Sequence, residues 1–241
     1  SSYNLPLLRT AFAPTGAFLS GLDAAIKVKG EDAIPVAIAG DGGTADIGIQ
    51  ALSGAVERGH NFIYICYDNE AYMNTGFQRS GATPLGARTS TTPGGSKRMY
   101  KAERKKDIAK IMAAHDMPYV ATAVPSYPDD LTDKVQKAAD IEGPAFLHVL
   151  SPCPLGWGYS ADQSVQLGRL AVETGQWKLY DVENGAPNLT VKPKERKPVK
   201  EYFEPQGRFD HLTDEDYKRR QEEVDEEWDK IESEGFSLCL E

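Results

Sequence analysis

Two short apolar runs, each ending in glycines, acids and amides, constrain the fold of this chain more than any other feature. The first covers residues 34–39 and is followed by Gly-Asp-Gly-Gly at 40–43, and the second covers 62–67 and is followed by the polar stretch 68–76. A helical pattern from about Asp46 to Arg58 joins them. Strand, helix and strand in this order predict a βαβ unit. Ligands of such units bind beyond the carboxyl ends of the parallel strands, where these polar residues fall.

The polar residues at the two strand ends suit a metal ion. Asp41 lies one residue past the first strand and Asn69 two residues past the second, so their side chains can converge. A carboxylate, an amide oxygen and a main-chain carbonyl from the following turn are the hard ligands that Mg²⁺ takes together with phosphate and water. Gly40, Gly42 and Gly43 let backbone amides approach a diphosphate, and the positive end of the following helix adds to the attraction.

Other nucleotide sites fit this stretch less well. Residues 40–45 lack the third glycine of the dinucleotide fingerprint G-x-G-x-x-G, and no G-x-x-x-x-G-K-[ST] loop is present. Either polar stretch alone is most often a turn. Both together, at matched strand ends of one βαβ unit, favour a metal and diphosphate site.

A family resemblance follows from these residues. Gly40-Asp41-Gly42 with Asn69 after the next strand resembles the thiamine diphosphate motif. The longer strings at 40–48 and 67–76 resemble the β subunit of the 2-oxoacid:ferredoxin oxidoreductases, a family that includes pyruvate synthase, with oxalate oxidoreductase as a close relative. The similarity covers about residues 5–212. It implies a thiamine diphosphate-binding fold in which Asp41 and Asn69 ligate Mg²⁺ through side chains and Ala71 through its carbonyl.

The resemblance also implies roles for neighbouring residues. Asn74 matches a position close to the reacting end of the cofactor and is the catalytic candidate, and Tyr72 and Thr75 complete the cofactor-binding set with the glycines. The implied reaction is oxidative decarboxylation of a 2-oxoacid, with pyruvate expected first. Electrons would pass through iron-sulfur clusters to ferredoxin, and coenzyme A is the usual acyl acceptor. The acid that activates the cofactor usually belongs to a partner subunit, so we expect activity only in the complex with other subunits.

Cys153 is the candidate ligand of an iron-sulfur cluster. It follows a predicted strand at 145–150, on the same edge as the cofactor site. From the sequence alone a free buried cysteine is favoured, but the resemblance implies that Ser-Pro-Cys at 151–153 gives one thiolate to a 4Fe-4S cluster. Such a cluster needs four ligands. We expect the other three on a cysteine-bearing segment upstream of Ser1, because Cys66 and Cys239 match no family ligand and the chain starts without an initiator Met, as if cut from something longer.

The remaining pattern alternates strands with helices and predicts one α/β domain over residues 1–170. Further strands are expected at 118–124 and 145–150, and helices at 15–27, 107–115 and 128–141. Strands that are apolar on both sides predict a parallel sheet covered by helices on both faces. Ala17, Gly21 and Ala24 are expected to pack on this sheet. His148, alone in mid-strand, is more typical of a satisfied core residue than of a catalytic base.

The segment 78–106 has no periodicity and reads as a loop. A loop this long is usually functional or mobile. Two interpretations stay open. In one, the segment is a solvent-exposed loop with basic patches at Lys97-Arg98 and 104–106. In the other, residues 75, 76, 78 and 83 line the mouth of the cofactor site and later residues pack against a partner subunit.

Residues 171–241 are predicted to form a C-terminal arm and helix for subunit contacts. A strand pair near 177–180 is followed by an extended stretch at 191–205 and a highly charged helix from Thr213 to about Glu232. The large apolar side chains of this helix form a thin stripe that could contact another subunit: Tyr217, Val224, Trp228 and Ile231.

Charge and hydropathy exclude several partners. A net charge of −9 argues against nucleic acid and anionic membranes. No apolar run approaches the ~18–20 residues of a membrane span, and no signal peptide is visible. The three cysteines have no paired spacing, which argues against a disulfide framework or a zinc site. A cytoplasmic protein is therefore expected.

Rival functions share parts of this site. The same chemistry on oxalate, 2-oxoisovalerate or an aryl 2-oxoacid is one, because Phe12-Ala13-Pro14 stands where the family commonly has Phe-Glu-Asn. A redox-free thiamine-dependent decarboxylase or synthase would need Asp41 and Asn69 but not Cys153. A non-catalytic scaffold that kept the fold is the third.

Overall fold

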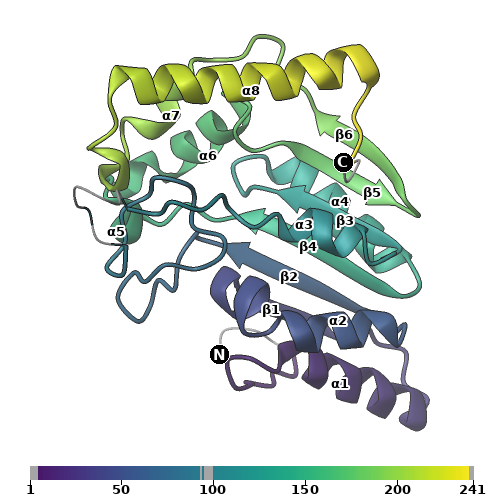
Figure 1. Ribbon diagram of the computed structural model, residues 1–241. Coiled ribbons are helices and arrows are strands. Elements are labelled where there is room, and N and C mark those ends of the chain that lie inside the picture. Colours follow the sequence, from purple (N-terminus) through teal and green to yellow (C-terminus); the bar gives the residue numbers. More distant parts are fainter. Residues whose placement is uncertain (1–4, 93, 95–99, 239–241) are drawn as a thin grey trace.

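A six-stranded sheet forms the centre of the described chain, residues 5–92, 94 and 100–238 of a computed structural model (Figure 1). The strand order is β1-β2-β4-β3-β5-β6. The first four strands are parallel, whereas β5 is antiparallel to β3 and β6 is antiparallel to β5. The strands are β1 (Val36–Gly40), β2 (Phe62–Asp68), β3 (Tyr119–Ala123), β4 (Pro144–Leu150), β5 (Leu179–Glu183) and β6 (Ala186–Val191).

The predicted α/β class is confirmed, but the sheet is mixed rather than wholly parallel. β5 runs antiparallel to β3, and a tight hairpin turns the chain back into β6. In this hairpin Asn184 and Gly185 both have positive φ angles, 48° and 80°. Asn-Gly is the preferred sequence of such two-residue hairpin loops. The strand pair predicted near 177–180 therefore extends the sheet beyond its parallel part.

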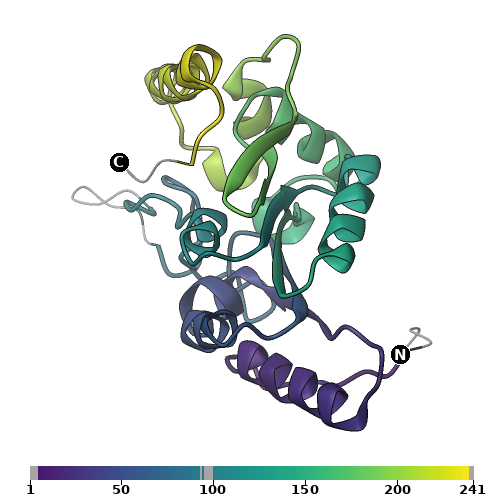
Figure 2. The same cartoon turned by 90° about the vertical axis from the view of Figure 1, so that its right-hand side faces the viewer.

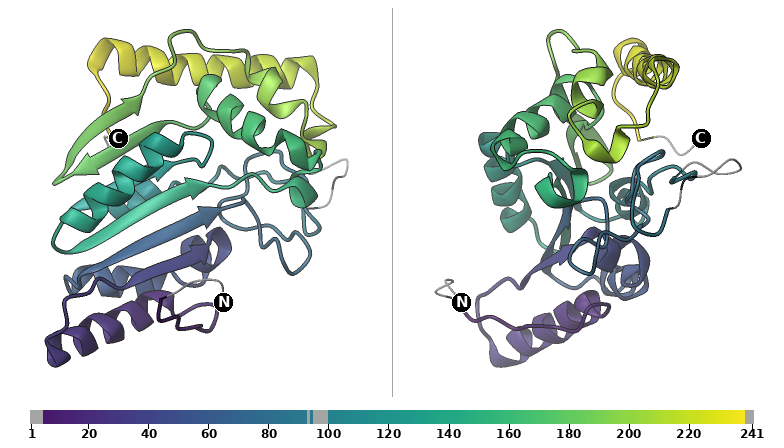
Figure 3. Two further views of the ribbon diagram at one scale, coloured as in Figure 1. Left: turned by 180° about the vertical axis from the view of Figure 1, so that it is seen from behind. Right: turned by 90° about the vertical axis from the view of Figure 1, so that its left-hand side faces the viewer.

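Helices cover both faces of the parallel strands (Figures 2 and 3). One core cluster joins α1, α2 and α3 to one face, and a second joins α4 to the other. Because neighbouring residues of a strand point to opposite faces, Phe62 and Tyr64 belong to the first cluster and Ile63 to the second. The helices and helical turns are α1 (Thr15–Lys29), η1 (Gly42–Asp46), α2 (Ile49–Glu57), α3 (Ile108–Ala113), α4 (Pro128–Asp140), α5 (Pro154–Trp157), η2 (Ala161–Gln163), α6 (Ser164–Glu173), α7 (Val199–Phe203), η3 (Gly207–Phe209) and α8 (Asp214–Glu234).

Helix α1 packs differently from the prediction. Ala17, Gly21 and Ala24 are exposed, so this small-residue face does not meet the sheet. The buried face carries Gly16 and Leu19 instead. A Cβ on Gly16 would lie 2.5 Å from the main chain of α2, which shows that α1 packs closely on α2 rather than on the strands.

The C-terminal helix α8 packs on its own chain. Val224 and Trp228 are buried in a cluster with α6 and α7, and Tyr217 and Ile231 pack against the same cluster. The apolar stripe predicted to contact another subunit is therefore used inside this chain, because the turn at Gly175 comes close enough to accept a 3.2 Å hydrogen bond from Trp228 Nε1. A subunit contact by the remaining surface of residues 171–241 stays a prediction.

None of the helices in the described part is both long and apolar enough to cross a membrane. Three residues named above, Lys97, Arg98 and Cys239, lie outside the described residues.

Candidate cofactor and metal site

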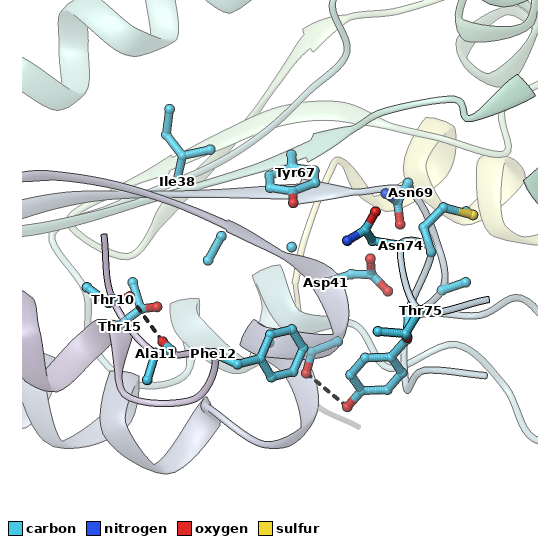
Figure 4. Close-up of a pocket in the computed structure, with 17 residues that line it drawn as sticks. Thr10, Ala11, Phe12, Thr15, Ile38, Asp41, Tyr67, Asn69, Asn74 and Thr75 are labelled. Atoms are coloured by element: carbon cyan, nitrogen blue, oxygen red, sulfur yellow. Dashed lines mark hydrogen bonds between the residues drawn. The ribbon is translucent and has the colours of Figure 1, made fainter. Parts of the chain in front are cut away.

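A cavity of about 450 Å³ opens beyond the carboxyl ends of β1 and β2 (Figure 4). The two strands are paired in parallel up to Gly40 and Tyr67, so their polar ends meet at one edge. The volume is typical of a small-molecule site. The whole predicted cofactor-binding set lines it: Gly40, Asp41, Gly42, Gly43, Asn69, Ala71, Tyr72, Asn74 and Thr75.

Three oxygen atoms converge on one side of this cavity. The side-chain oxygen of Asn69 lies 2.9 Å from the carbonyl oxygen of Ala71 and 3.0 Å from Oδ1 of Asp41. Octahedral Mg²⁺ with bonds of 2.0–2.1 Å holds neighbouring oxygens about 2.9 Å apart, so the spacing fits this ion. Turning the amide over would instead let its nitrogen donate to both oxygens. The cluster therefore suits either a cation or, without one, a donating amide.

Asp41 is a buried acid, and among the described residues it forms no ion pair. It is 1% exposed, and its Oδ2 accepts a 2.5 Å hydrogen bond from Ser80 Oγ. Burial and the negative charge of Asp68 raise the pKa of Asp41 to about 8. A divalent cation at the free oxygen would favour the ionised form and lower this pKa again. The buried carboxylate of Asp41 and the spacing of the oxygens therefore both favour a divalent cation at this position.

Asp68, one residue before Asn69, differs from Asp41 in that cationic side chains surround its carboxylate. Burial alone would raise its pKa, but Lys105 and His148 hold the pKa well below the usual value. Nζ of Lys105 lies 2.6 Å and Nε2 of His148 lies 2.7 Å from Oδ2 of Asp68. His148 is thus a paired core residue, in line with the interpretation favoured from the sequence.

The glycine loop is a turn of π-helix, and the regular helix begins only at Ile49. A Cβ on Gly42 would lie 2.4 Å from the ring of Tyr72. The Tyr72 hydroxyl donates to the Gly42 carbonyl and to Asp46 Oδ2, both at 3.2 Å. Glycine at this position therefore lets the turn after β2 pack directly on the turn after β1.

Several lining residues escaped the sequence reasoning. Ile38 and Tyr67 share one face of β1 and β2, and both are more than two-fifths exposed. Because side chains alternate between the two faces along a strand, the sequence could have indicated that these two residues lie on the same side of the sheet. In the lead-in, Phe12 belongs to the stretch 12–14 that was compared above with the family's Phe-Glu-Asn, whereas the other lining residues there carry no motif. The additional lining residues are Thr10, Ala11, Phe12, Thr15, Ile38, Ala39, Tyr67 and Met73.

The predicted mouth of the site is only partly correct. Thr75 lines the cavity, but Gly76, Gln78 and Thr83 do not. Gln78 exchanges two hydrogen bonds with Thr75, of 2.6 and 2.7 Å. Thr83 is buried and donates a 2.7 Å hydrogen bond to the carbonyl of Glu70. The long loop therefore supports the turn at 69–75 from behind.

Cys153 is half-buried and lies at the start of α5, a short helix that contacts the turn at 69–75. Nε1 of Trp157, in the same short helix, donates a 2.8 Å hydrogen bond to the carbonyl of Asn69. The other free cysteine of the described residues, Cys66, is buried in β2. Within that part of the chain no group of three or more His, Cys, Asp or Glu residues could hold a metal. Cys153 can therefore be one ligand of a cluster but not its whole site.

Comparisons with known proteins agree with this geometry. Residues 10–149 match the family described as thiamine pyrophosphate enzyme, C-terminal TPP binding domain; thiamine pyrophosphate is another name for thiamine diphosphate. Pyruvate synthase subunit PorB of Methanothermobacter thermautotrophicus is 55% identical over 226 residues, which are 93% of this chain and 78% of the relative. Ketoisovalerate oxidoreductase subunit VorB of Pyrococcus horikoshii is 49% identical over 239 residues, 96% and 77% of the two chains.

A solved structure gives the same result. The 2-oxoglutarate:ferredoxin oxidoreductase from Magnetococcus marinus, with 2-oxoglutarate, coenzyme A and succinyl-CoA bound, matches with a TM-score of 0.52 at 27% identity. The match covers 58% of this chain and 45% of that chain. The family resemblance read from the sequence is confirmed: the chain belongs to the thiamine diphosphate-binding β subunits of the 2-oxoacid:ferredoxin oxidoreductases.

Proposed function

We propose that this chain holds Mg²⁺ and thiamine diphosphate in the cavity at the ends of β1 and β2 and takes part there in oxidative decarboxylation of a 2-oxoacid. The observation that carries the proposal is the convergence of Asp41 Oδ1, the Asn69 side-chain amide and the Ala71 carbonyl within 3.0 Å, which offers three oxygens to a cation when the amide oxygen faces the other two groups. When bound, thiamine diphosphate supplies an electron sink for the decarboxylation. The protein's part is to bind, orient and shield it.

Each lining residue has a distinct part in this proposal. Asp41 Oδ1, Asn69 Oδ1 and the Ala71 carbonyl would hold the metal, and the metal would supply positive charge for the diphosphate. Gly42 and Gly43 would offer main-chain amides of η1 to the diphosphate, while the space beside Gly42 is filled by the ring of Tyr72. Asn74, on the turn beyond, would lie close to the reacting end of the cofactor, and Thr75 would complete the cofactor-binding set. Asn74 is the catalytic candidate, and Figure 4 shows its side chain pointing toward Asp41 and Asn69.

We assign to Cys153 the role of one thiolate ligand of a 4Fe-4S cluster. Its support is the position of α5, whose Trp157 hydrogen bonds to the Asn69 carbonyl and whose Gly156 packs on Met73 of the cofactor turn. The remaining ligands would come from outside the described residues. Ferredoxin as electron acceptor and coenzyme A as acyl acceptor complete the proposal, which assumes a cytoplasmic complex with other subunits.

Pyruvate is the substrate we propose first. Relatives at 54–55% identity are named pyruvate synthase subunits, and a relative at 49% is named for ketoisovalerate. 2-Oxoisovalerate is therefore the second candidate, ahead of oxalate and aryl 2-oxoacids. Viologen reduction by the intact complex across these acids decides between them. A complex without iron or viologen reduction would favour the redox-free alternative.

The metal site is tested separately by Asp41→Ala in the assembled protein. We expect this variant to lose Mg²⁺-dependent thiamine diphosphate binding by more than the about 10- to 100-fold that loss of an outer partner of a metal ligand typically produces. Binding equal to wild type would refute the assignment. If the wild-type complex itself contains no thiamine diphosphate after reconstitution, the chain is a scaffold.

A further inference from the structure

The turn between the two proposed metal-binding oxygens has an unfavourable backbone conformation. Glu70, which lies between Asn69 and Ala71, has a φ angle of 67°. Residues with a Cβ rarely occupy this left-handed region. The oxygens on either side of Glu70 can keep their spacing only if the surrounding structure holds the residue in place.

The Glu70 carboxylate is held on both of its oxygens. Lys105 Nζ lies 2.7 Å from Oε1, and Arg208 Nη2 lies 2.6 Å from Oε2. Lys105 also bridges to Asp68 Oδ2 at 2.6 Å. The side chains of Glu70 and Arg208 are 5% and 1% exposed, so solvent screens this pair little. The carboxylate cannot rotate without breaking one of the two ion pairs.

The main chain of the turn is held as well. The Glu70 amide donates a 2.8 Å hydrogen bond to Asp68 Oδ1, and its carbonyl accepts one of 2.7 Å from Thr83 Oγ1. Trp157 Nε1 donates to the Asn69 carbonyl at 2.8 Å. These contacts leave the Asn69 side chain and the Ala71 carbonyl directed toward the cavity.

The two cations that hold Glu70 come from distant parts of the chain. Lys105 belongs to the long loop before α3, and Arg208 belongs to η3, where its guanidinium lies 3.8 Å from the ring centre of Trp157. Buried ion pairs are often no more stabilising than well-packed apolar side chains. A fixed geometry at the neighbouring turn is a gain that apolar residues would not supply.

We propose that Glu70, clamped by Lys105 and Arg208, is a positioning residue that sets the Asn69 and Ala71 oxygens at the spacing Mg²⁺ requires. This inference rests on the proposed function of the site. Glu70 does not line the cavity. It acts on the metal only through the backbone of the turn.

The test is an Mg²⁺ titration of thiamine diphosphate binding to the assembled protein, with Glu70→Gln as the variant. The expected result is a rise of about 10- to 100-fold in the Mg²⁺ concentration for half-maximal binding, as for loss of an outer partner of a metal ligand. Full binding is expected at saturating Mg²⁺, because all three ligand oxygens remain. Lys105→Met is expected to shift the titration in the same direction, and it decides the matter if Glu70→Gln does not assemble.

Asp181→Asn is the matched control. Asp181 is also a buried acid paired with a lysine, Lys137, at 2.6 Å, but it lies in β5, far along the sheet from the cavity. Its titration should coincide with that of wild type. An unshifted titration in both Glu70→Gln and Lys105→Met, or an equal shift in Asp181→Asn, overturns the inference.

Failure of this inference is distinguishable from failure of the proposed function. If wild type needs Mg²⁺ and Asp41→Ala abolishes binding while the clamp variants titrate like wild type, only the positioning role is refuted. If wild type binds thiamine diphosphate without Mg²⁺, both are refuted.

Discussion

Replacement of Gly42 by alanine tests whether the two turns of the site pack on each other as described. The added Cβ would lie 2.4, 2.6 and 2.7 Å from three carbons of the Tyr72 ring. Carbon atoms ordinarily stay about 3.5–4.0 Å apart, so the ring must retreat by about 1 Å. The Tyr72 hydroxyl would then leave the Gly42 carbonyl and Asp46, which it now reaches at 3.2 Å.

The expected loss of stability is about 2 to 4 kcal/mol. Overpacking typically costs about 1–3 kcal/mol, and each of the two hydrogen bonds contributes about 0.5–1.5 kcal/mol. The lower half of the summed range applies because Tyr72 is only half-buried and its ring can swing outward. The assay is urea unfolding of the purified protein, with thiamine diphosphate binding measured in parallel.

Gly21→Ala is the matched control, because nothing lies within 4 Å of a Cβ at this exposed position of α1. Alanine there should stabilise the helix by about 0.5–1 kcal/mol. In a Tyr72→Ser background the clash is removed, so the Gly42→Ala effect should shrink by at least about 1 kcal/mol, as expected for residues in contact. A Gly42→Ala protein that unfolds like wild type would refute the packing argument.

Three further predictions concern single contacts. Trp157→Phe removes the hydrogen-bond donor to the Asn69 carbonyl, so the free energy of unfolding should fall by about 1 kcal/mol. In the Mg²⁺ titration of thiamine diphosphate binding, the Mg²⁺ concentration for half-maximal binding should rise. An unchanged concentration would show that this hydrogen bond does not position Asn69. Thr213→Ala removes the N-cap of α8 and should lower stability by about 0.5–2 kcal/mol in thermal unfolding; no change would show that the cap is dispensable. Burial would raise the pKa of Asp181, but hydrogen bonds from Lys137 and Asn188 hold it below the ordinary 3.8. The ionised Asp181 carboxylate therefore stabilises the fold above pH 3.8, and this stabilisation is lost as the pH falls through the lower pKa of the folded state. Below about pH 4 the stability of Asp181→Asn should fall less steeply with pH than that of wild type. Curves of stability against pH that run parallel for the two proteins would contradict this role of Asp181.

The sequence was sufficient to predict the side of the cavity that holds the proposed cofactor-binding set, because these residues come from two short stretches with recognisable spacing. Asp41 and Asn69 each follow a strand directly, and parallel pairing of neighbouring strands brings their ends together. The clamp behind the turn could not be found this way. Glu70 pairs with residues 35 and 138 positions away, and no local pattern reports such distant ion pairs.

Three other differences between the sequence prediction and the structure have separate causes. The β5–β6 hairpin had a signal in Asn184-Gly185, which the reasoning did not use. Small residues on α1 were assigned to the sheet by size alone, whereas the close approach occurs at Gly16 against α2. The stripe on α8 looked unpartnered because its partners, including Trp228's acceptor Gly175, lie 53 positions earlier in the chain.

The central claim is that Asp41, Asn69 and Ala71 hold one metal ion. The most direct test is a density map of the assembled protein with thiamine diphosphate bound and Mn²⁺ in place of Mg²⁺. The anomalous scattering of Mn²⁺ locates the metal in this map. We predict one metal peak within about 2.0–2.3 Å of Asp41 Oδ1, Asn69 Oδ1 and the Ala71 carbonyl oxygen, bridging to the diphosphate. A peak elsewhere, or an Asn69 amide nitrogen donating to the other two oxygens while the cofactor is bound, would contradict it.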